Sequence, residues 1–361
     1  MMIDVDFGAY RYFPALRTRQ AELKGLEKLD EERKRKILPI LTLGRWPKAL
    51  DFSKAAAKAA DAAGGPFILD LTSDGAHLAN EQLRLRDPDS AYSAWRAFAA
   101  ETPSAIPVVQ AADVFGVRDF IKQAQAIEKA ASRVVFRIRD FSKDTSTVIG
   151  ALSALDDVRN ALVLIDCQYI RPALVAYVTA CVSTINALRA EFPELVIAVL
   201  GTSFPQSTVP FADASGTRGS IDILERSLHA RIGGNAVAAY GDHSSVHSVV
   251  YDDVPIMRWA ARIDYPRELD WYFERRPSDQ SAAGYESAAK AVIAVDPDIG
   301  TRGIWGEEVI LRAAAGDLQG QKAPSPWISV RVNIHLARQI DLAARQRAGQ
   351  DSDEEDGDFE E

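Results

Sequence analysis

The sequence predicts an α/β protein in which eight strand–helix units close into a (β/α)8 barrel. Three observations lead to this fold class. Eight short apolar segments recur along the chain, their starts lie 27 to 40 residues apart, and a helical pattern fills each gap between them. That rhythm is typical of repeated βα units, and eight units are enough to close a barrel of the TIM type. The segments are 10–16, 37–43, 67–72, 105–110, 134–140, 161–167, 196–202 and 236–242.

The strand segments differ in how strongly they indicate a barrel strand. Residues 67–72 are apolar except for Asp70 and Thr72, as is typical of a parallel strand buried on both faces. Pro39 and Pro107 weaken the second and fourth segments, because proline cannot donate to a strand ladder. In the fifth segment Arg137 and Arg139 alternate with apolar residues, so both face the same side of the strand. Two arginines on a buried side need carboxylate partners or a ligand.

The gaps between the strands carry helical patterns. Residues 20–36 place Leu23, Leu26 and Leu29 on one face opposite a charged face, and residues 117–131 repeat this amphipathic pattern. Residues 172–188 form the most apolar helix, but polar residues such as Thr179 and Ser183 interrupt it. This pattern indicates a buried barrel helix rather than a membrane span.

After the eighth strand the pattern changes. Residues 256–276 indicate two strands joined at 265–267, which would form a β-hairpin inserted in the last βα loop at the barrel mouth, within residues 251–280. Helices are expected at 281–294, 304–315 and 327–347, so that 281–348 form a C-terminal helical part. We therefore expect one domain over residues 1–350. Residues 351–361 contain eight acidic residues and no basic one, and we expect this acidic tail to be disordered.

Composition narrows the classes of function. The acidic tail accounts for all but one unit of the net charge of −9, so the rest of the chain is near neutral. A basic face of the kind that dominates nucleic-acid binding is not evident, and a nucleic-acid partner is not favoured. Cys167 and Cys181 suggest neither a disulfide framework nor a metal site. The first residues lack the basic and apolar segments of a secretory signal, so we expect a cytoplasmic protein with no membrane partner.

The polar residues at the strand ends form the candidate site, because the carboxyl ends of barrel strands meet at one mouth. Carboxylates there can act as acid and base, and arginines can clamp a phosphate or carboxylate. The candidate catalytic residues are Asp70, Asp166 and Asp242, and the candidate ligand-binding residues are Arg17, Arg139, Asp140, Gln168, His243 and Arg218. The alternative is internal ion pairing, with Asp70 and Asp166 held by Arg137 or Arg139.

Known catalytic and cofactor motifs give little guidance. No phosphate-binding loop, dinucleotide fingerprint or serine nucleophile elbow occurs in the sequence. His243 and His247 lie four apart without the glutamate of a metalloprotease, so we predict no metal site and leave the cofactor unknown. Residues 215–220, with Arg218, could hold a phosphate if Ser220 starts a helix; the alternative is a flexible loop.

The predicted hairpin is rich in aromatic residues and arginines. Trp259, Arg262, Tyr265 and Trp271 are candidate partner-binding residues, because such residues can stack on bases or grip a protein. The alternative is a hairpin whose aromatic face packs on the barrel while the arginines remain solvated.

Several segments together resemble one known family. They are LRTRQAELKGLEKL, ILPILTL, YGDH, IDYPRELDWYFERR and WISVRVNIHLARQI, and the resemblance covers about residues 10–345. These segments are similar to the beta protein family, which is named after a phage protein and occurs in bacteria and their mobile elements. The resemblance implies a TIM-like barrel, a phage-related or defence-type context, and no settled activity. The family often has an aromatic residue where this chain has His243.

Three functions follow as hypotheses. The first is a recognition component of a phage-defence-type system that binds an unknown protein or a small anionic ligand. The second is a barrel enzyme that acts on a phosphorylated or anionic substrate, using Asp70, Asp166 and Asp242 with Arg139. The third is an accessory nucleic-acid binder that uses the hairpin.

Overall fold

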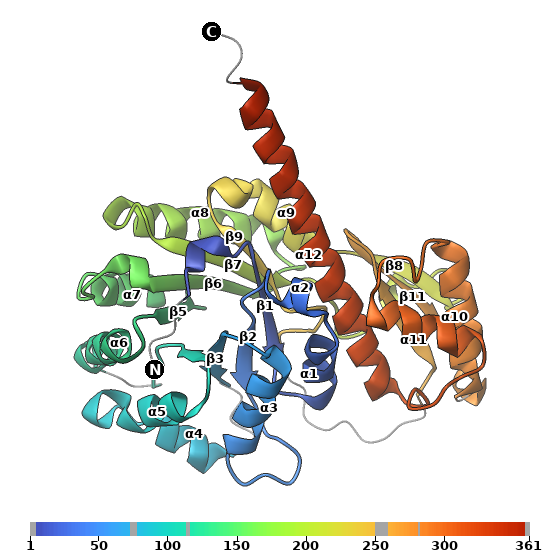
Figure 1. Cartoon of the computed structure of the whole chain (residues 1–361), viewed down its shortest axis with the longest axis horizontal. Coiled ribbons are helices and arrows are strands. Elements are labelled where there is room, and N and C mark those ends of the chain that lie inside the picture. The colour runs from blue at the N-terminus through green and yellow to red at the C-terminus, as the bar shows by residue number, and fades with distance from the viewer. Residues whose placement is uncertain (1–4, 73–77, 113–115, 250–258, 281, 358–361) are drawn as a thin grey trace.

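Eight parallel strands form a closed ring surrounded by helices (Figure 1). The structure, a computed structural model, describes residues 5–72, 78–112, 116–249, 259–280 and 282–357, with the backbone alone for 347–357. The barrel strands are β1 (Tyr12–Arg17), β2 (Ile40–Leu43), β3 (Phe67–Leu71), β4 (Ala105–Pro107), β5 (Val134–Ile138), β6 (Ala161–Tyr169), β7 (Val196–Thr202) and β9 (Ala239–Asp242). All eight predicted strands are present. The two prolines delimit them, since β2 begins after Pro39 and β4 ends at Pro107.

Strand pairing confirms that the ring is closed. The strand order is β4-β3-β2-β1-β9-β7-β6-β5, and β1 pairs in parallel with both β2 and β9. The remaining gap, between β4 and β5, is bridged by Val108 and Val135, and the Val109 amide donates to the Val135 carbonyl at 2.8 Å. The predicted (β/α)8 barrel is therefore confirmed.

The two-residue period of the strands sorts side chains between the barrel lumen and the helix layer. Alternate residues of each strand fill the lumen with a compact apolar core, which includes Phe13, Ile40, Ile68, Val135 and Leu164. The residues between them pack outward against the helices in two further clusters. Along each strand, a lumen-facing residue at the carboxyl end therefore points into the barrel mouth.

The helices of the outer layer follow the predicted order. They are α1 (Gln20–Glu27), α2 (Glu31–Lys34), α3 (Ser53–Ala63), α4 (Ala79–Leu85), α5 (Asp89–Glu101), α6 (Val117–Ala131), α7 (Asp144–Leu152), α8 (Leu174–Glu191) and α9 (Leu224–Arg231). The predicted helix 20–36 is divided into α1 and α2, because the Asp30 carboxylate accepts from the Arg33 amide at 2.9 Å and starts a second helix. Cys167 and Cys181 are buried free thiols whose sulfur atoms lie 3.3 Å apart.

Beside the barrel lies a three-stranded antiparallel sheet in the order β10-β11-β8. Strands β10 (Arg262–Pro266) and β11 (Asp270–Arg275) form the predicted hairpin. The third strand, β8 (Arg218–Asp222), was not predicted. The sequence left two interpretations of residues 215–220, a phosphate-holding loop if Ser220 starts a helix or a flexible loop. The first is wrong, because Ser220 pairs with Tyr272 in the middle of β8 and no helix begins there, and the second missed this strand.

Three C-terminal helices complete the chain, at the predicted positions. They are α10 (Ala283–Val295), α11 (Trp305–Ala314) and α12 (Pro324–Gly357). Helix α12 passes between the barrel and the three-stranded sheet (Figure 1). It approaches α1 and α11 closely at Gly25 and Gly306, where an added Cβ would lie 2.7 Å and 2.6 Å from side chains of α12.

Helix α12 also continues further than the sequence indicated. It extends through residues 351–357, the first part of the acidic tail that we expected to be disordered, because adding residues to an existing helix costs far less than starting one. Residues 358–361 lie outside the described part of the chain. Within the described ranges, no helix is both long and apolar enough to cross a lipid bilayer.

Candidate functional site

At the carboxyl ends of the strands, two acids and two arginines form one network inside the barrel mouth. Arg137 from β5 donates to Asp70 from β3 at 2.7 Å and to Asp166 from β6 at 2.8 Å. Arg139, one lumen-facing position further along, lies 3.1 Å from Asp70 and 3.4 Å from Asp166. His243, which follows β9, completes the network through Nε2, 2.9 Å from Asp166 Oδ1. The structure therefore brings together four predicted site residues, two from strands β3 and β6 and two that directly follow β5 and β9.

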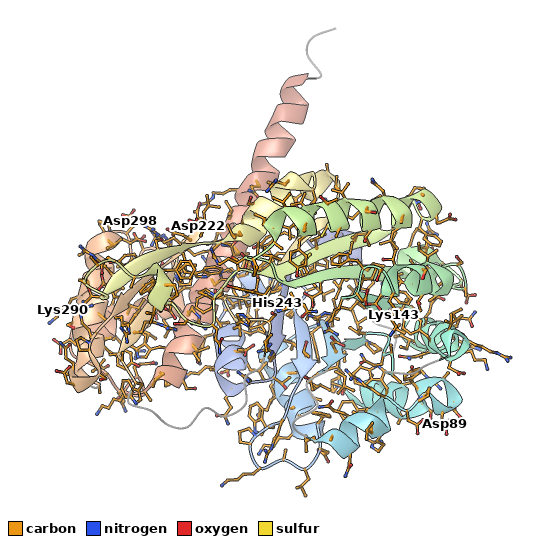
Figure 2. The ribbon with its side chains drawn as sticks, turned by 180° about the vertical axis from the view of Figure 1, so that it is seen from behind. Asp89, Lys143, Asp222, His243, Lys290 and Asp298 are labelled. Atoms are coloured by element: carbon orange, nitrogen blue, oxygen red, sulfur yellow. The ribbon has the colours of Figure 1, made fainter. Side chains whose placement is uncertain are left out.

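Burial separates the members of this network into a core and a rim. The side chains of Asp70, Asp166 and Arg137 are 2%, 1% and 4% exposed, whereas those of Arg139 and His243 are 31% and 13% exposed. The carboxylates are thus enclosed by cations, and the groups that meet the opening are a guanidinium and an imidazole. In Figure 2 His243 lies near the centre of the molecule, between the barrel and the three-stranded sheet.

The charges fix the protonation state of the two acids. Burial alone would raise the pKa of Asp70, but Arg139 and Arg137 hold that pKa below its ordinary value. Burial is likewise outweighed at Asp166, whose pKa lies well below its ordinary value because of Arg137 and His243. Both acids are therefore ionised at neutral pH and cannot act as proton donors there.

A cavity of about 140 Å³ opens above this network. Its lining includes Arg17, Arg137, Arg139, Asp166, Gln168 and His243, so five predicted site residues share it with Arg137, which was predicted only as an ion-pair partner. Arg17 reaches across the opening and donates to the backbone carbonyl of Ser248. The mouth thus contains three guanidiniums.

Gln168 lies at an irregular point of the mouth. The pairing of β6 with β7 shifts register between Asp166 and Tyr169, and Gln168 adopts a left-handed backbone with φ 54°. The backbone amide of Gln168 donates to Asp166 Oδ1 at 3.0 Å, while the Gln168 side chain is exposed at the cavity. Strain of this kind is characteristic of positions where a side chain is aimed at a site.

Asp242 is not part of the mouth, which corrects its prediction as a catalytic residue. It has the same strand parity as Tyr240 and therefore faces the helix layer. Its carboxylate accepts hydrogen bonds from the hydroxyls of Tyr12 and Tyr240, each at 2.9 Å, and lies 2.8 Å from His335 Nε2 of α12. Asp242 is 1% exposed, so its role in this structure is to attach α12 to the barrel.

Two predicted ligand-binding residues also lie elsewhere. The exposed Asp140 carboxylate accepts from the backbone amides of Ser142 and Lys143 at 3.1 Å, so it caps the turn that leads into α7. Arg218 lies in β8, 63% exposed, with its Nε 3.3 Å from Asp213. Neither lines the mouth cavity, so both are removed from the candidate site.

The four predicted partner-binding residues are divided between the core and a second cavity. Tyr265 and Trp271 are 0% and 1% exposed, and they are removed from the partner surface because no partner can reach them in this conformation. The aromatic residues of the hairpin pack on both of its faces: Tyr265 belongs to the core beside the helices, and Trp271 packs with Phe204 on the other side. Trp259 and Arg262 remain half-buried and line a cavity next to the mouth.

Sequence reasoning named Arg137 only in the ion-pairing alternative, a pairing that the structure shows for both arginines, and it left Gln110 and Thr42 out of the site. Arg137 is the central cation, Gln110 donates to Asp70 at 3.0 Å, and Thr42 lies 3.3 Å from Arg137. The signal for Arg137 and Thr42 was present, because each lies two residues beyond a lumen-facing apolar residue. Over the same described ranges, no group of three or more His, Cys, Asp or Glu side chains is arranged to hold a metal ion.

The fold and the site define a TIM-like (β/α)8 barrel with an arginine-rich mouth and a lateral β-sheet. Residues 12–341 match the sequence model of the Beta protein family, and the chain belongs to that family. It is 42% identical to Protein beta of Enterobacteria phage P4 over 353 residues, which cover 98% of this chain and 99% of the phage protein. These matches confirm the family resemblance and its phage-related character.

One solved structure also aligns along the chain. It is a protein assigned to the dihydrodipicolinate synthase family from Coccidioides immitis, with a TM-score of 0.37 and 13% identity, covering 95% of this chain and 99% of that one.

Proposed function

We propose that this protein is a cytoplasmic recognition component that binds a small anionic ligand at the barrel mouth. One observation carries the proposal: Arg137 neutralises the buried acids, and Arg139, partly exposed, is presented to the cavity with His243 beside it. An anion in the cavity would meet guanidinium groups, while Asp70 and Asp166 are already enclosed by arginines. Glu22 also lines the cavity, but it is buried and accepts from the Arg17 backbone amide at 2.7 Å.

The geometry of the mouth favours a phosphate or carboxylate group. A guanidinium offers donors in a planar fork that matches both groups. Arg139 is held in place by its contacts with Asp70 and Asp166, so less conformational freedom is lost when a ligand binds. Gln168 adds an amide donor at the same opening.

The family relationship supplies the biological setting of the proposal. A chain of this family with a preformed anion site fits a sensor in a phage-related or defence-type system, in which ligand binding is reported to another component. This defence role rests on the family relationship and on the anion site together.

Isothermal titration with inorganic phosphate tests the site directly. The wild type should bind phosphate, and Arg139→Gln should weaken binding at least about tenfold, because a hydrogen bond to a charged group is worth roughly 1.5–3 kcal/mol. Arg159→Gln is the control, since Arg159 is a surface arginine paired with Asp157 at 2.8 Å. Failure of the wild type to bind phosphate, or equal binding by Arg139→Gln, would reject the proposal.

A second candidate, an enzyme acting on an anionic substrate, is favoured by the pairing of His243 with Asp166. A carboxylate that orients an imidazole is the arrangement of a general base, and His243 is partly exposed to the cavity. In this version the acid–base group is His243 rather than Asp70 or Asp166. Incubation with a mixture of phosphorylated metabolites, followed by mass spectrometry, separates the candidates. Conversion by the wild type but not by His243→Gln supports an enzyme, and no conversion by either favours binding alone.

A further inference from the structure

A second and larger cavity adjoins the barrel mouth. It has a volume of about 500 Å³ and lies between the mouth and the three-stranded sheet. It shares Arg17, Val246, His247 and Val249 with the mouth cavity, so the two spaces are adjacent. Their combined size falls in the range of sites for small organic ligands rather than for a bare phosphate.

Three aromatic rings stacked on one another form one wall of this cavity. Tyr285 of α10 is the middle ring: its centroid lies 5.6 Å from that of Trp259 and 4.9 Å from that of Trp327, with interplanar angles of 25° and 21°. Tyr285 and Trp327 are 0% and 4% exposed, whereas Trp259 is half-buried at the cavity. The stack therefore ends in one accessible indole ring.

Arginines supply most of the charged groups in the rest of the lining. Arg262 and Arg331 share Asp264, at 2.8 Å and 2.6 Å respectively. Arg19 and Arg275 line the same cavity, and neither guanidinium has an ion-pair or hydrogen-bond partner among the described residues. With Arg17, five arginines and one aspartate thus line the cavity beside the aromatic wall.

We infer that the two cavities together bind a nucleoside phosphate, with the base stacked on Trp259 and the phosphate at Arg139. The inference rests on the proposed function, because it assigns the anion of that function to a chemical class. Nucleobases stack on aromatic side chains whatever their sequence, and arginines bind the attached phosphates. The hydroxyl of Tyr285 is buried without a hydrogen-bond partner in the described structure, on the same wall.

Other anionic ligands fit these observations less well. A simple carboxylate or sugar phosphate has no flat aromatic face to extend the stack at Trp259. A protein partner would meet a recessed cavity whose aromatic rings are mostly buried. Free nucleotides and the 5′ end of a nucleic-acid strand both offer a base next to a phosphate, so the probes below include one of each.

Titration calorimetry with four probes tests the inference: inorganic phosphate, adenosine, AMP and a 5′-phosphorylated single-stranded oligoadenylate. AMP should bind at least about tenfold more tightly than phosphate, within the range that stacking of one base provides. Trp259→Leu should remove that gain and leave phosphate binding unchanged. Trp305→Leu is the matched control, since Trp305 of α11 is also half-buried but lies outside both cavities. Thermal melts verify that both variants are folded.

The outcomes separate the two proposals. AMP binding no tighter than phosphate, or equal losses in Trp259→Leu and Trp305→Leu, would overturn the nucleoside assignment and leave the anion site standing. If adenosine binds but inorganic phosphate does not, the anion site is rejected and the base site is kept. Preference for the oligonucleotide over AMP identifies a strand end as the source of the ligand, and the reverse preference identifies a free nucleotide.

Discussion

Arg137 should be the most important single side chain for the stability of the barrel mouth. It spans the lumen between Asp70 and Asp166, at 2.7 Å and 2.8 Å, and all three side chains are almost completely buried. Arg137→Met would retain much of the apolar stem but would leave two buried carboxylates with Arg139 as their remaining arginine. Removing one partner of a buried ion pair typically costs 3–5 kcal/mol. Because Arg139 still lies within 3.4 Å of both acids, we expect a loss of about 3 kcal/mol.

Urea unfolding followed by circular dichroism measures this loss. The double variant Arg137→Met with Asp166→Asn should be more stable than the single variant by roughly 1–2 kcal/mol, because Arg139 then neutralises Asp70 alone. The asparagine can still accept from His243 and from the Gln168 amide. The single variant should also regain stability as the pH falls toward 5, since unpaired buried acids bind protons more readily. The reasoning would be refuted if the single variant were within 1 kcal/mol of the wild type in unfolding free energy, or if the double variant were less stable than the single variant.

Three further predictions concern the packing of a barrel strand, the protonation of two buried groups and the turn capped by Asp140. Gly241→Ala should destabilise the protein by about 1–3 kcal/mol in urea unfolding, because its Cβ would lie 2.2 Å from Leu200 Cδ2; an unchanged midpoint would contradict the packing argument. Burial raises the pKa of Glu225 to about 7, so its contribution to stability is complete below its unfolded pKa and is lost as the pH rises to about 7. Burial lowers the pKa of His229 to about 4, and its contribution is lost as the pH falls, which opposes that of Glu225. Glu225→Gln should therefore gain stability relative to the wild type as the pH rises from 5 to 8, by on the order of 3 kcal/mol. An equal difference in unfolding free energy between variant and wild type at the two pH values would exclude this linkage. Asp140→Ala should lower the melting temperature slightly and leave phosphate binding intact, and a loss of phosphate affinity would restore Asp140 to the site.

The barrel could be predicted from the sequence because its strands are buried on both faces. Such strands appear as continuous apolar runs, as in residues 161–167, and their spacing reflects the helices between them. The hairpin was visible for a related reason: β10 and β11 carry large apolar residues on either side of a short turn, although the turn lies at residues 267–269 rather than at the predicted 265–267. The mouth followed from the barrel, since Asp70, Asp166, Arg139 and His243 end its strands.

The error at Asp242 and the omission of Arg137 have one physical origin, which is strand parity. Asp242 was assigned to the mouth because it ends an apolar run, but the lumen-facing residues there are Ala239, Gly241 and His243. Residues one position apart on a strand face opposite sides, so Asp242 shares the outer side of Tyr240. Parity could have been applied to the sequence alone. It would have excluded Asp242 and included Arg137.

Other features carry no local signal. Strand β8 has the sequence RGSID, with one buried side chain at Ile221, and it forms through its pairing with β11. A short polar segment of this kind cannot be distinguished from a loop before its partner is known. The second cavity is equally invisible, because Arg19 and Trp327 come from opposite ends of the chain and meet Trp259 and Arg275 of the hairpin segment only in the folded structure.

The position of α12 delays completion of the fold during synthesis, because an early helix packs on a late one. Helix α1 begins at Gln20 and packs on α12, which begins at Pro324, and β1 pairs with β9. At roughly 5–20 residues per second, the interval between synthesis of α1 and of α12 is on the order of 15–60 s. During that time the side of α1 that carries Gly25 lacks the α12 residues that pack on it in the folded protein. The newly made N-terminal part would therefore benefit from a holding chaperone until α12 has been synthesised.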